Sequence, residues 1–195
     1  MANVALLVEG SLDETVGRRL ATFCGHTVSI VYGKQGFGYI RTNIAAFNAT
    51  ASGISTIALA DSMDMHEPCP PGTLHILLPN PHPRMRFRLA VREIESWLLA
   101  DRANLAAFLG VPVSRMPENP DAIRDPKLTL MRAARGSSRP TVRRLIPPQP
   151  GYRSREGPGY TSEMQRFALN TWDIAAACAR SDSLRGCIAS IRTLT

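Results

Sequence analysis

The sequence has few cysteines, no long hydrophobic run and almost no lysine. Its four cysteines form no CxxC pair, and their spacings match no zinc site or small disulfide framework. A reduced compartment is the simplest inference. No apolar stretch approaches the roughly 18 residues of a membrane span, and the first residues lack the pattern of a signal peptide. We therefore expect a cytoplasmic protein that has no membrane partner.

The basic charge comes almost entirely from arginine. The formal net charge is +7 and the isoelectric point is near 9.8. Lys34 and Lys127 are the only lysines, so 21 of the 23 basic residues are arginine. The planar guanidinium suits phosphate and carboxylate better than a point charge does. Two explanations remain open, namely an anion-binding face and the preference of a GC-rich genome for arginine codons.

The length and composition are those of a folded protein. A chain of 195 residues can form one compact domain with an appended or inserted piece, whereas two full domains would be cramped. Hydrophobic residues make up 44% and charged residues 20%, which argues against global disorder.

The first half of the sequence alternates between strand and helix patterns. Short apolar runs predict strands at 2–8, 28–32, 54–61, 74–80 and 85–89. Helical spacing follows Ser11, where Ser11 and Glu14 fit a capping box, and recurs at 40–47 and 94–105. This alternation predicts an α/β fold with a parallel or mixed sheet and right-handed crossovers.

The second half of the sequence has a different character. The segment 112–126 is rich in proline, and the segment 136–160 is rich in proline, glycine and arginine. Neither segment can therefore hold a long helix or a central strand. Helical spacing returns over 162–194, with a break at Ser181-Asp182. We expect a helical pair there that covers one face of the sheet.

Acidic residues follow three of the predicted strands. Glu9 follows the first strand, Asp61 ends the strand at 54–61 and Asp64 comes soon after it, and Glu93 and Glu95 follow the last strand. The carboxyl ends of parallel strands meet at one edge of a sheet, where ligands collect. Clustered carboxylates are tolerated best around a cation, and their hard oxygens suit Mg²⁺ or Mn²⁺. The alternative is that each acid only stabilises the N-terminus of a nearby helix.

Two pairs of motifs resemble known families. "LLVEGSLDE" and the later "TIALADSMD" look like the Toprim domain of topoisomerases, primases and overcoming-lysogenization-defect nucleases. "AVREIESWLLAD" and "SDSLRGCIASIRTL" resemble an uncharacterised bacterial family of small Toprim-like proteins, some of them encoded beside ATPases in loci proposed to act in phage defence. The resemblance runs from Val4 to Leu194.

The resemblance implies a fold and a division of the chain. It implies a Toprim-like, Rossmann-like and mostly parallel sheet flanked by helices, with a helical C-terminal extension. The α/β core would span 1–110, a Pro/Gly/Arg-rich connecting region would span 111–161, and C-terminal helices packed on the core would span 162–195.

The resemblance also implies roles for individual acids. Glu9 matches the Toprim glutamate, a metal ligand or general base, and Asp61 matches the first acid of the Asp-x-Asp motif, a metal ligand. The chain departs from the family at Met63, which stands where the second Asp belongs. Asp64 or Glu95 would have to replace it, so the predicted ligands of Mg²⁺ or Mn²⁺ are Glu9, Asp61, Asp64 and Glu95.

Both lysines are candidates for phosphate contacts. Lys34 lies in the loop "GKQGFG", whose bare N–H groups could cradle a phosphate, although the loop is no Walker A motif. A plain strand-to-helix turn is the alternative. Lys127 is predicted to act with Glu9 and Asp61 in catalysis by steadying a phosphate, and a solvated lysine at a helix start is the alternative.

The Arg-rich stretch suggests a contact with nucleic acid. It interleaves basic side chains with two tyrosines, and arginines for phosphates with aromatic rings for base stacking are typical of single-strand binding. A surface loop with no specific partner is the alternative. Together with Lys34, the predicted nucleic-acid-binding residues are Arg139, Arg143, Arg144, Arg153 and Arg155, and the tyrosines are Tyr152 and Tyr160.

The sequence therefore supports one leading function and two alternatives. The leading function is a metal-dependent nuclease or phosphodiesterase that acts on DNA or RNA, with an ATPase as a partner in phage defence. The first alternative is a non-catalytic Toprim-like subunit of an ATPase complex, which the altered Asp-x-Asp motif favours. The second alternative is a hydrolase of small phosphate esters.

Overall fold

The chain folds into two compact units. The computed structural model describes residues 1–62, 70–147 and 154–195. The first unit comprises residues 1–94 and 183–195, and the second comprises residues 95–182. Within the described part of the chain, no helix has the length and hydrophobicity that a membrane span requires.

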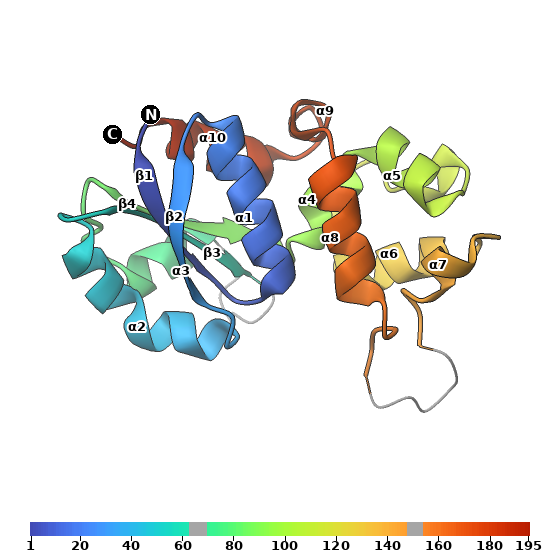
Figure 1. The fold of residues 1–195 in the computed structure, drawn as a ribbon, viewed down its shortest axis with the longest axis horizontal. Coiled ribbons are helices and arrows are strands. Elements are labelled where there is room, and N and C mark those ends of the chain that lie inside the picture. Colours follow the sequence, from blue (N-terminus) through green and yellow to red (C-terminus); the bar gives the residue numbers. More distant parts are fainter. Residues whose placement is uncertain (63–69, 148–153) are drawn as a thin grey trace. The chain divides into compact units, whose positions relative to one another are not determined.

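The first unit contains a sheet of four parallel strands (Figure 1). The strands are β1 (Asn3–Val8), β2 (Thr27–Gly33), β3 (Ser55–Asp61) and β4 (Met85–Ala90), in the order β2-β1-β3-β4. Every pairing is parallel. The predicted α/β fold with a parallel sheet is thus confirmed.

Burial explains why these segments form strands in these places. The central strands β1 and β3 have runs of five and six buried residues, as expected where helices cover both faces of a sheet. The edge strand β4 alternates at its start between buried and half-buried residues, and the edge strand β2 is largely exposed. The continuously apolar runs in the sequence therefore mark the middle of the sheet.

Helices cover both faces of the sheet. On one face lie α1 (Ser11–Phe23) and α10 (Asp182–Arg192), with Gly17 of α1 against Leu6 of β1 and Ser190 of α10 bonded to Arg86 of β4. On the other face, α2 (Phe37–Thr50) and α3 (Pro70–Leu77) pack against a buried cluster. That cluster includes Leu7, Ile40, Ile44, Ala58 and Phe87.

One strand prediction is wrong. The segment predicted as a strand at 74–80 forms the end of α3, which stops at Leu77, and Pro79 and Pro81 follow before β4 begins. A short apolar run fits a buried helix as well as a strand, because either can turn it toward a core. Leu74 and Leu77 pack on the sheet from this helix.

The second unit is helical. Its helices are α4 (Glu95–Ala100), α5 (Arg102–Leu109), α6 (Pro126–Ala134), α7 (Pro140–Arg143), α8 (Tyr160–Asn170) and α9 (Ile174–Cys178), with 3₁₀ turns at Val113–Arg115 and Pro120–Ala122. Trp97 and Trp172 are buried in its core, where the indole N–H of Trp172 donates a hydrogen bond to the Trp97 carbonyl oxygen at 3.2 Å.

The predicted helical C-terminal region is confirmed, although it holds three helices rather than a pair. The additional break falls between α8 and α9, where the side chain of Asp173 caps α9 by accepting a hydrogen bond from the Ala176 N–H. The helices α8 and α9 belong to the second unit, and α10 after Asp182 belongs to the first unit.

Candidate functional site

Two acids meet at the carboxyl edge of the sheet. Glu9 directly follows β1, and Asp61 is the last residue of β3, the neighbouring strand. The Asp61 N–H donates a hydrogen bond of 2.6 Å to Oε1 of Glu9. Both residues are half-buried. The parallel register of the two central strands therefore brings the Glu9 carboxylate to the main chain of Asp61, a residue 52 positions later in the chain.

The main chain holds both carboxylates in place. Asp61 Oδ1 accepts a hydrogen bond from the Ile94 N–H at 2.9 Å, just as Glu9 Oε1 accepts one from Asp61. The edge thus presents two fixed oxygen-donor groups.

The loop "GKQGFG" docks against the end of β1. The Lys34 N–H donates to the Val8 carbonyl oxygen at 2.8 Å, and the Gly36 N–H donates to the Glu9 carbonyl oxygen at 3.0 Å. Gly33 has φ +94°, and a Cβ there would collide with the Val8 carbonyl oxygen, so only glycine fits without strain. These two N–H groups therefore fasten the loop between β2 and α2 to the end of β1.

The side chain of Lys34 is engaged in an ion pair. Its Nζ lies 2.9 Å from Glu14 Oε2 on α1, and Arg18 bonds the other oxygen of the same carboxylate. The hydrogen bond from Lys34 lowers the pKa of Glu14, with a smaller contribution from Arg18, although burial acts in the opposite direction. The lysine predicted to contact nucleic acid thus ties the loop to α1.

The other predicted metal ligands are placed differently. Asp64 lies outside the described residues. Glu95 is the first residue of α4 in the second unit. Within residues 1–62, 70–147 and 154–195, no three His, Cys, Asp or Glu side chains are grouped so that they could hold a metal ion.

Glu95 belongs to a polar cluster inside the second unit. Its side chain is 2% exposed, and its Oε1 accepts a hydrogen bond from the buried Tyr160 hydroxyl at 2.9 Å. Lys127 Nζ lies 3.6 Å from the same oxygen, 2.9 Å from Glu156 Oε1 and 5.7 Å from the centre of the Tyr160 ring. The sequence did not predict the contacts of Tyr160 with Glu95 or of Glu156 with Lys127, because no local pattern links residues so distant in the chain.

Three of the arginines predicted to bind nucleic acid lie in or directly beside α7. Arg139, Arg143 and Arg144 are exposed there, whereas Arg155 forms an ion pair with Asp125. Arg153 and Tyr152 lie outside the described residues. Because the ring of Tyr160 is buried, it is not placed to stack on a base.

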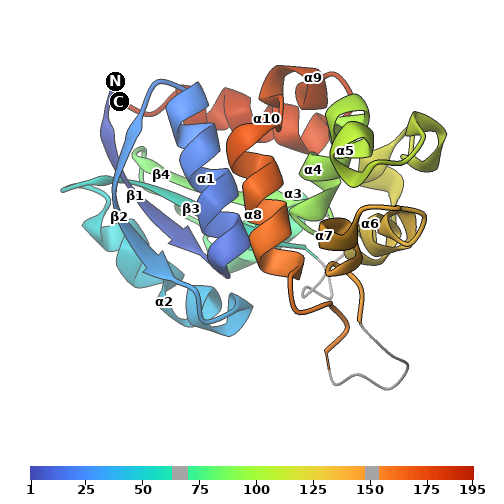
Figure 2. The same ribbon diagram turned by 45° about the vertical axis from the view of Figure 1, so that its right-hand side comes forward.

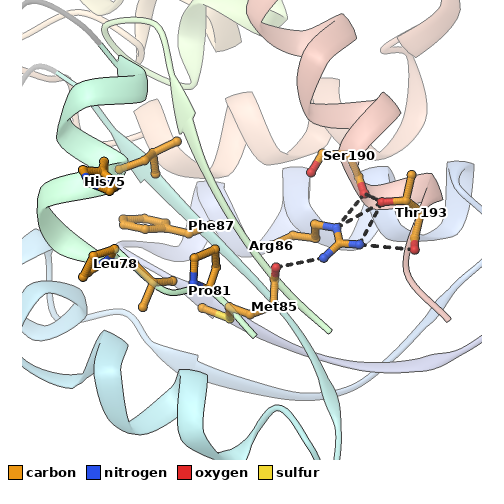
Figure 3. A pocket seen from close by; sticks show the side chains of 10 residues that line it. His75, Leu78, Pro81, Met85, Arg86, Phe87, Ser190 and Thr193 are labelled. Atoms are coloured by element: carbon orange, nitrogen blue, oxygen red, sulfur yellow. Dashed lines mark hydrogen bonds between the residues drawn. The ribbon is translucent and has the colours of Figure 1, made fainter. Parts of the chain in front are cut away.

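A cavity of about 510 Å³ lies at the opposite end of the sheet (Figure 3). It lies beside the first residues of β4, away from Glu9 and Asp61. Arg86 directs its guanidinium at carbonyl oxygens of Pro83, Met85, Ser190 and Thr193, and burial lowers its pKa. The lining residues are Leu74, His75, Leu78, Pro79, Pro81, Met85, Arg86, Phe87, Ser190 and Thr193.

Arg86 has a structural role at this cavity. All of its N–H groups point to neutral acceptors that join the start of β4 to the last turn of α10. Cations stabilise the carbonyl end of a helix. The arginine therefore fastens α10 to the edge strand.

Comparison with known proteins leaves the motifs and the geometry as the basis for assigning a function. No protein-family model, curated protein or solved structure matches the chain. The resemblance to Toprim proteins stays a prediction from the short motifs around Glu9, Asp61 and Glu95.

Proposed function

We propose that the protein is a metal-dependent phosphodiesterase of Toprim type that cleaves DNA or RNA. Glu9 and Asp61 bind Mg²⁺ or Mn²⁺ at the carboxyl edge of the sheet. The observation that carries this proposal is the contact between the two acids, in which Glu9 Oε1 accepts a hydrogen bond from the main chain of Asp61 at 2.6 Å. The edge where these acids lie is the usual place for ligands in open α/β sheets.

The donor set fits a magnesium ion. Mg²⁺ usually keeps several water ligands and takes only one or two carboxylates from the protein, together with substrate phosphates. Glu9 and Asp61 supply two carboxylates whose orientation is fixed by N–H groups of Asp61 and Ile94. When bound, the ion would activate water and stabilise charge on the phosphate.

A second ion would need further ligands. Two-metal sites hold their cations about 4 Å apart and share several carboxylates. Asp64 is proposed as one of them from the sequence alone. Glu95 and Lys127 stay predictions for ligand and phosphate contact, and their described partners are Tyr160 and Glu156.

A non-catalytic subunit of an ATPase complex is the second candidate. The observation that favours it is Met63, which replaces the second acid of the Toprim motif. In this candidate, Glu9 and Asp61 bind a structural ion or none, and the protein acts through its partner.

Metal titration and cleavage assays on the same samples test the proposal. Mn²⁺ and Mg²⁺ are titrated calorimetrically into the wild type and into Glu9→Gln/Asp61→Asn, and each sample is then incubated with plasmid, single-stranded DNA, RNA and a mononucleotide ester. These substitutions keep an oxygen that can accept the main-chain hydrogen bonds, so the edge keeps its structure while it loses two negative charges. Glu118→Gln, at an exposed acid of the second unit, is the control.

We expect metal binding and metal-dependent cleavage in the wild type and in the Glu118→Gln control. The double variant should bind metal at least about tenfold more weakly and lose cleavage. Binding without cleavage would favour the subunit candidate, and cleavage of the mononucleotide ester alone would indicate a small-molecule hydrolase. If the wild type neither binds metal at millimolar concentration nor cleaves any substrate, the acids are structural and the proposal is wrong.

A further inference from the structure

The second unit contains a long segment without acidic residues. Between Pro126 and Arg155 the sequence has no Asp or Glu, whereas it has Lys127 and seven arginines. The described part of this segment forms α6, the turn at 136–139 and α7. Positive charge therefore accumulates on a few neighbouring elements and is not spread evenly over the chain.

Glycines let two arginine side chains lie flat against the main chain of this unit. A Cβ on Gly136, just after α6, would collide with Nη1 of Arg115. A Cβ on Gly110, the left-handed residue that ends α5, would lie 2.8 Å from Nε of Arg139. The guanidinium group of Arg115 and the side chain of Arg139 thus occupy space that any other residue type would fill.

Hydrogen bonds bring a third arginine to the same turn. Arg139 Nη1 donates to the Phe108 carbonyl oxygen at 2.8 Å, and Arg143 Nε donates to the Ser137 carbonyl oxygen at 3.4 Å. Ser137 is buried, and its hydroxyl oxygen accepts a hydrogen bond from the Arg139 N–H at 3.0 Å. Figure 2 shows α5, α6 and α7, the helices that border this turn, within the second unit.

These three residues, which we call the arginine cluster, have positive charges that no carboxylate offsets within the described residues. Arg115, Arg139 and Arg143 are all exposed, and none of them forms an ion pair in the described part of the chain. Two other arginines of the same unit differ, since Arg155 pairs with Asp125 and Arg166 pairs with Glu163. The charges of the cluster are therefore available to an external anion.

We propose that the arginine cluster binds the phosphate backbone of a nucleic acid without regard to base sequence. The proposal rests on the proposed function, because it names the surface that would hold the polymer while another part of the chain cleaves it. A guanidinium group offers two parallel N–H donors to one phosphate, and several such groups around one turn match the repeated charges of a polynucleotide. Side chains already held against glycines lose less conformational entropy on binding.

Binding is measured in EDTA, so that metal and cleavage play no part. Fluorescence anisotropy with labelled single-stranded and duplex DNA gives the affinity at salt concentrations from about 50 to 200 mM, a range over which phosphate contacts weaken steeply. The test variant is Arg115→Gln/Arg139→Gln/Arg143→Gln. The matched control, Arg41→Gln/Arg124→Gln/Arg180→Gln, removes the same charge at exposed positions elsewhere.

We expect the test variant to bind at least about tenfold more weakly than the control at low salt. Each phosphate contact contributes about 0.7 to 0.9 to the slope of log K against log salt, so the loss of three contacts should reduce the slope by about 2 to 3. The corresponding triple lysine variant keeps the charge and should retain most of that slope. Thermal unfolding of every variant verifies that it is folded.

A neutral substitution provides a second measurement. Gly136→Ala keeps every charge but displaces the Arg115 guanidinium from its place against the turn, a movement that a flexible side chain allows. Affinity should fall severalfold, and the slope should decrease by no more than about 1. Gly38→Ala, where a Cβ meets open space in the first unit, is the glycine control.

Equal weakening by the test and control variants would overturn the proposal, because binding would then depend on net charge alone. Binding to phosphatidylserine vesicles without binding to DNA would also overturn it. The result can be distinguished from a failure of the proposed function. Glu9→Gln/Asp61→Asn should bind DNA in EDTA as the wild type does, even if the wild type takes up no metal.

Discussion

The two units of the chain position charged side chains in different ways. In the first unit, the carboxylates of Glu9 and Asp61 are half-buried and receive hydrogen bonds from main-chain N–H groups. In the second unit, Arg115 and Arg139 are exposed and lie against glycines. The acids are placed by the pairing of strands, whereas the arginines are placed by turns at the ends of helices.

This difference shows what each kind of charge requires. A carboxylate removed from water needs donors, and at this edge of the sheet the main-chain N–H groups of Asp61 and Ile94 are among them. A guanidinium group on the surface keeps much of its hydration, so it needs only room and a few carbonyl oxygens. A change in the backbone should therefore disturb Glu9 and Asp61 at the carboxyl edge of the sheet much more than it disturbs the arginine cluster.

The largest expected effect is that of Gly33→Ala. Alanine disfavours φ +94°, and its Cβ would collide with the Val8 carbonyl oxygen next to Glu9. We expect a loss of about 3 kcal/mol in the free energy of unfolding, measured with urea. The same variant should bind metal more weakly than the wild type but bind DNA in EDTA equally well.

Gly38→Ala is the matched control for this substitution. Gly38 lies within α2, and a Cβ there meets open space. Because alanine favours helix more than glycine does, the control should gain up to about 1 kcal/mol in stability. Equal destabilisation by both substitutions would mean that the close contact at Gly33 has no special importance.

A smaller effect is expected in the second unit, where Asp101→Ala removes the side chain that caps α5. This buried carboxylate accepts hydrogen bonds from the Asn104 N–H at the start of α5 and from the Asp173 N–H at 2.7 Å. Its loss leaves those donors without their acceptor and should cost about 2 kcal/mol. Hydrogen exchange should show the loss of protection in α5 and α9, while β1 and β3 keep theirs.

Asp101→Asn keeps an acceptor oxygen and should cost less than half as much. If the two substitutions cost the same, the charge of Asp101 matters more than its hydrogen bonds. If protection falls in β1 and β3 as strongly as in α5, the loss of Asp101 destabilises both units equally, and the second unit does not open separately from the first.

The smallest effect is expected at Glu14, where an acid and a lysine pair on the first unit. The pKa of Glu14 is lowered chiefly by its hydrogen bond with Lys34, so the folded state favours the ionised carboxylate. Its contribution to stability is therefore present above the pKa of the unfolded chain and is lost as the pH falls through the lower, folded pKa.

Glu14→Gln should accordingly cost about 0.5 kcal/mol at neutral pH, an amount typical of a partly exposed ion pair, and less at high salt. Urea unfolding from pH 7 down to pH 3 measures this difference. It should shrink as the wild type becomes protonated. A constant difference over that range would show that shape, and not charge, explains the cost.

The sequence predicted that Glu9 and Asp61 lie at the carboxyl edge of the sheet, because each acid is marked by the apolar run directly before it. An apolar run that ends in an acid places Glu9 and Asp61 at strand ends, and a parallel sheet then brings them together. The strand predicted at 74–80 failed for a related reason, because a short apolar run does not distinguish a buried helix from a strand. A short apolar run predicts that the segment is buried, but it does not predict whether the segment is a helix or a strand.

The sequence could not reveal the remaining features, because they depend on contacts between distant residues. Nothing near Glu95 predicts that the hydroxyl of Tyr160 will bond to it across 65 positions. Nor does "ARGSSRP" indicate that Gly136 leaves room for the guanidinium of Arg115. Such pairs arise from how helices pack, which no spacing along the chain encodes.

The place of α10 in the chain also constrains the order of folding during synthesis. This helix covers a face of the sheet together with α1, yet it follows the whole of the second unit in the sequence. Its last turn accepts hydrogen bonds from Arg86, and the Thr195 carbonyl oxygen accepts one from the Ser55 hydroxyl. A ribosome that has released all four strands has therefore not yet released the helix that completes their covering. The strands must wait, partly covered, while the second unit is made, and this is an interval in which a chaperone could act.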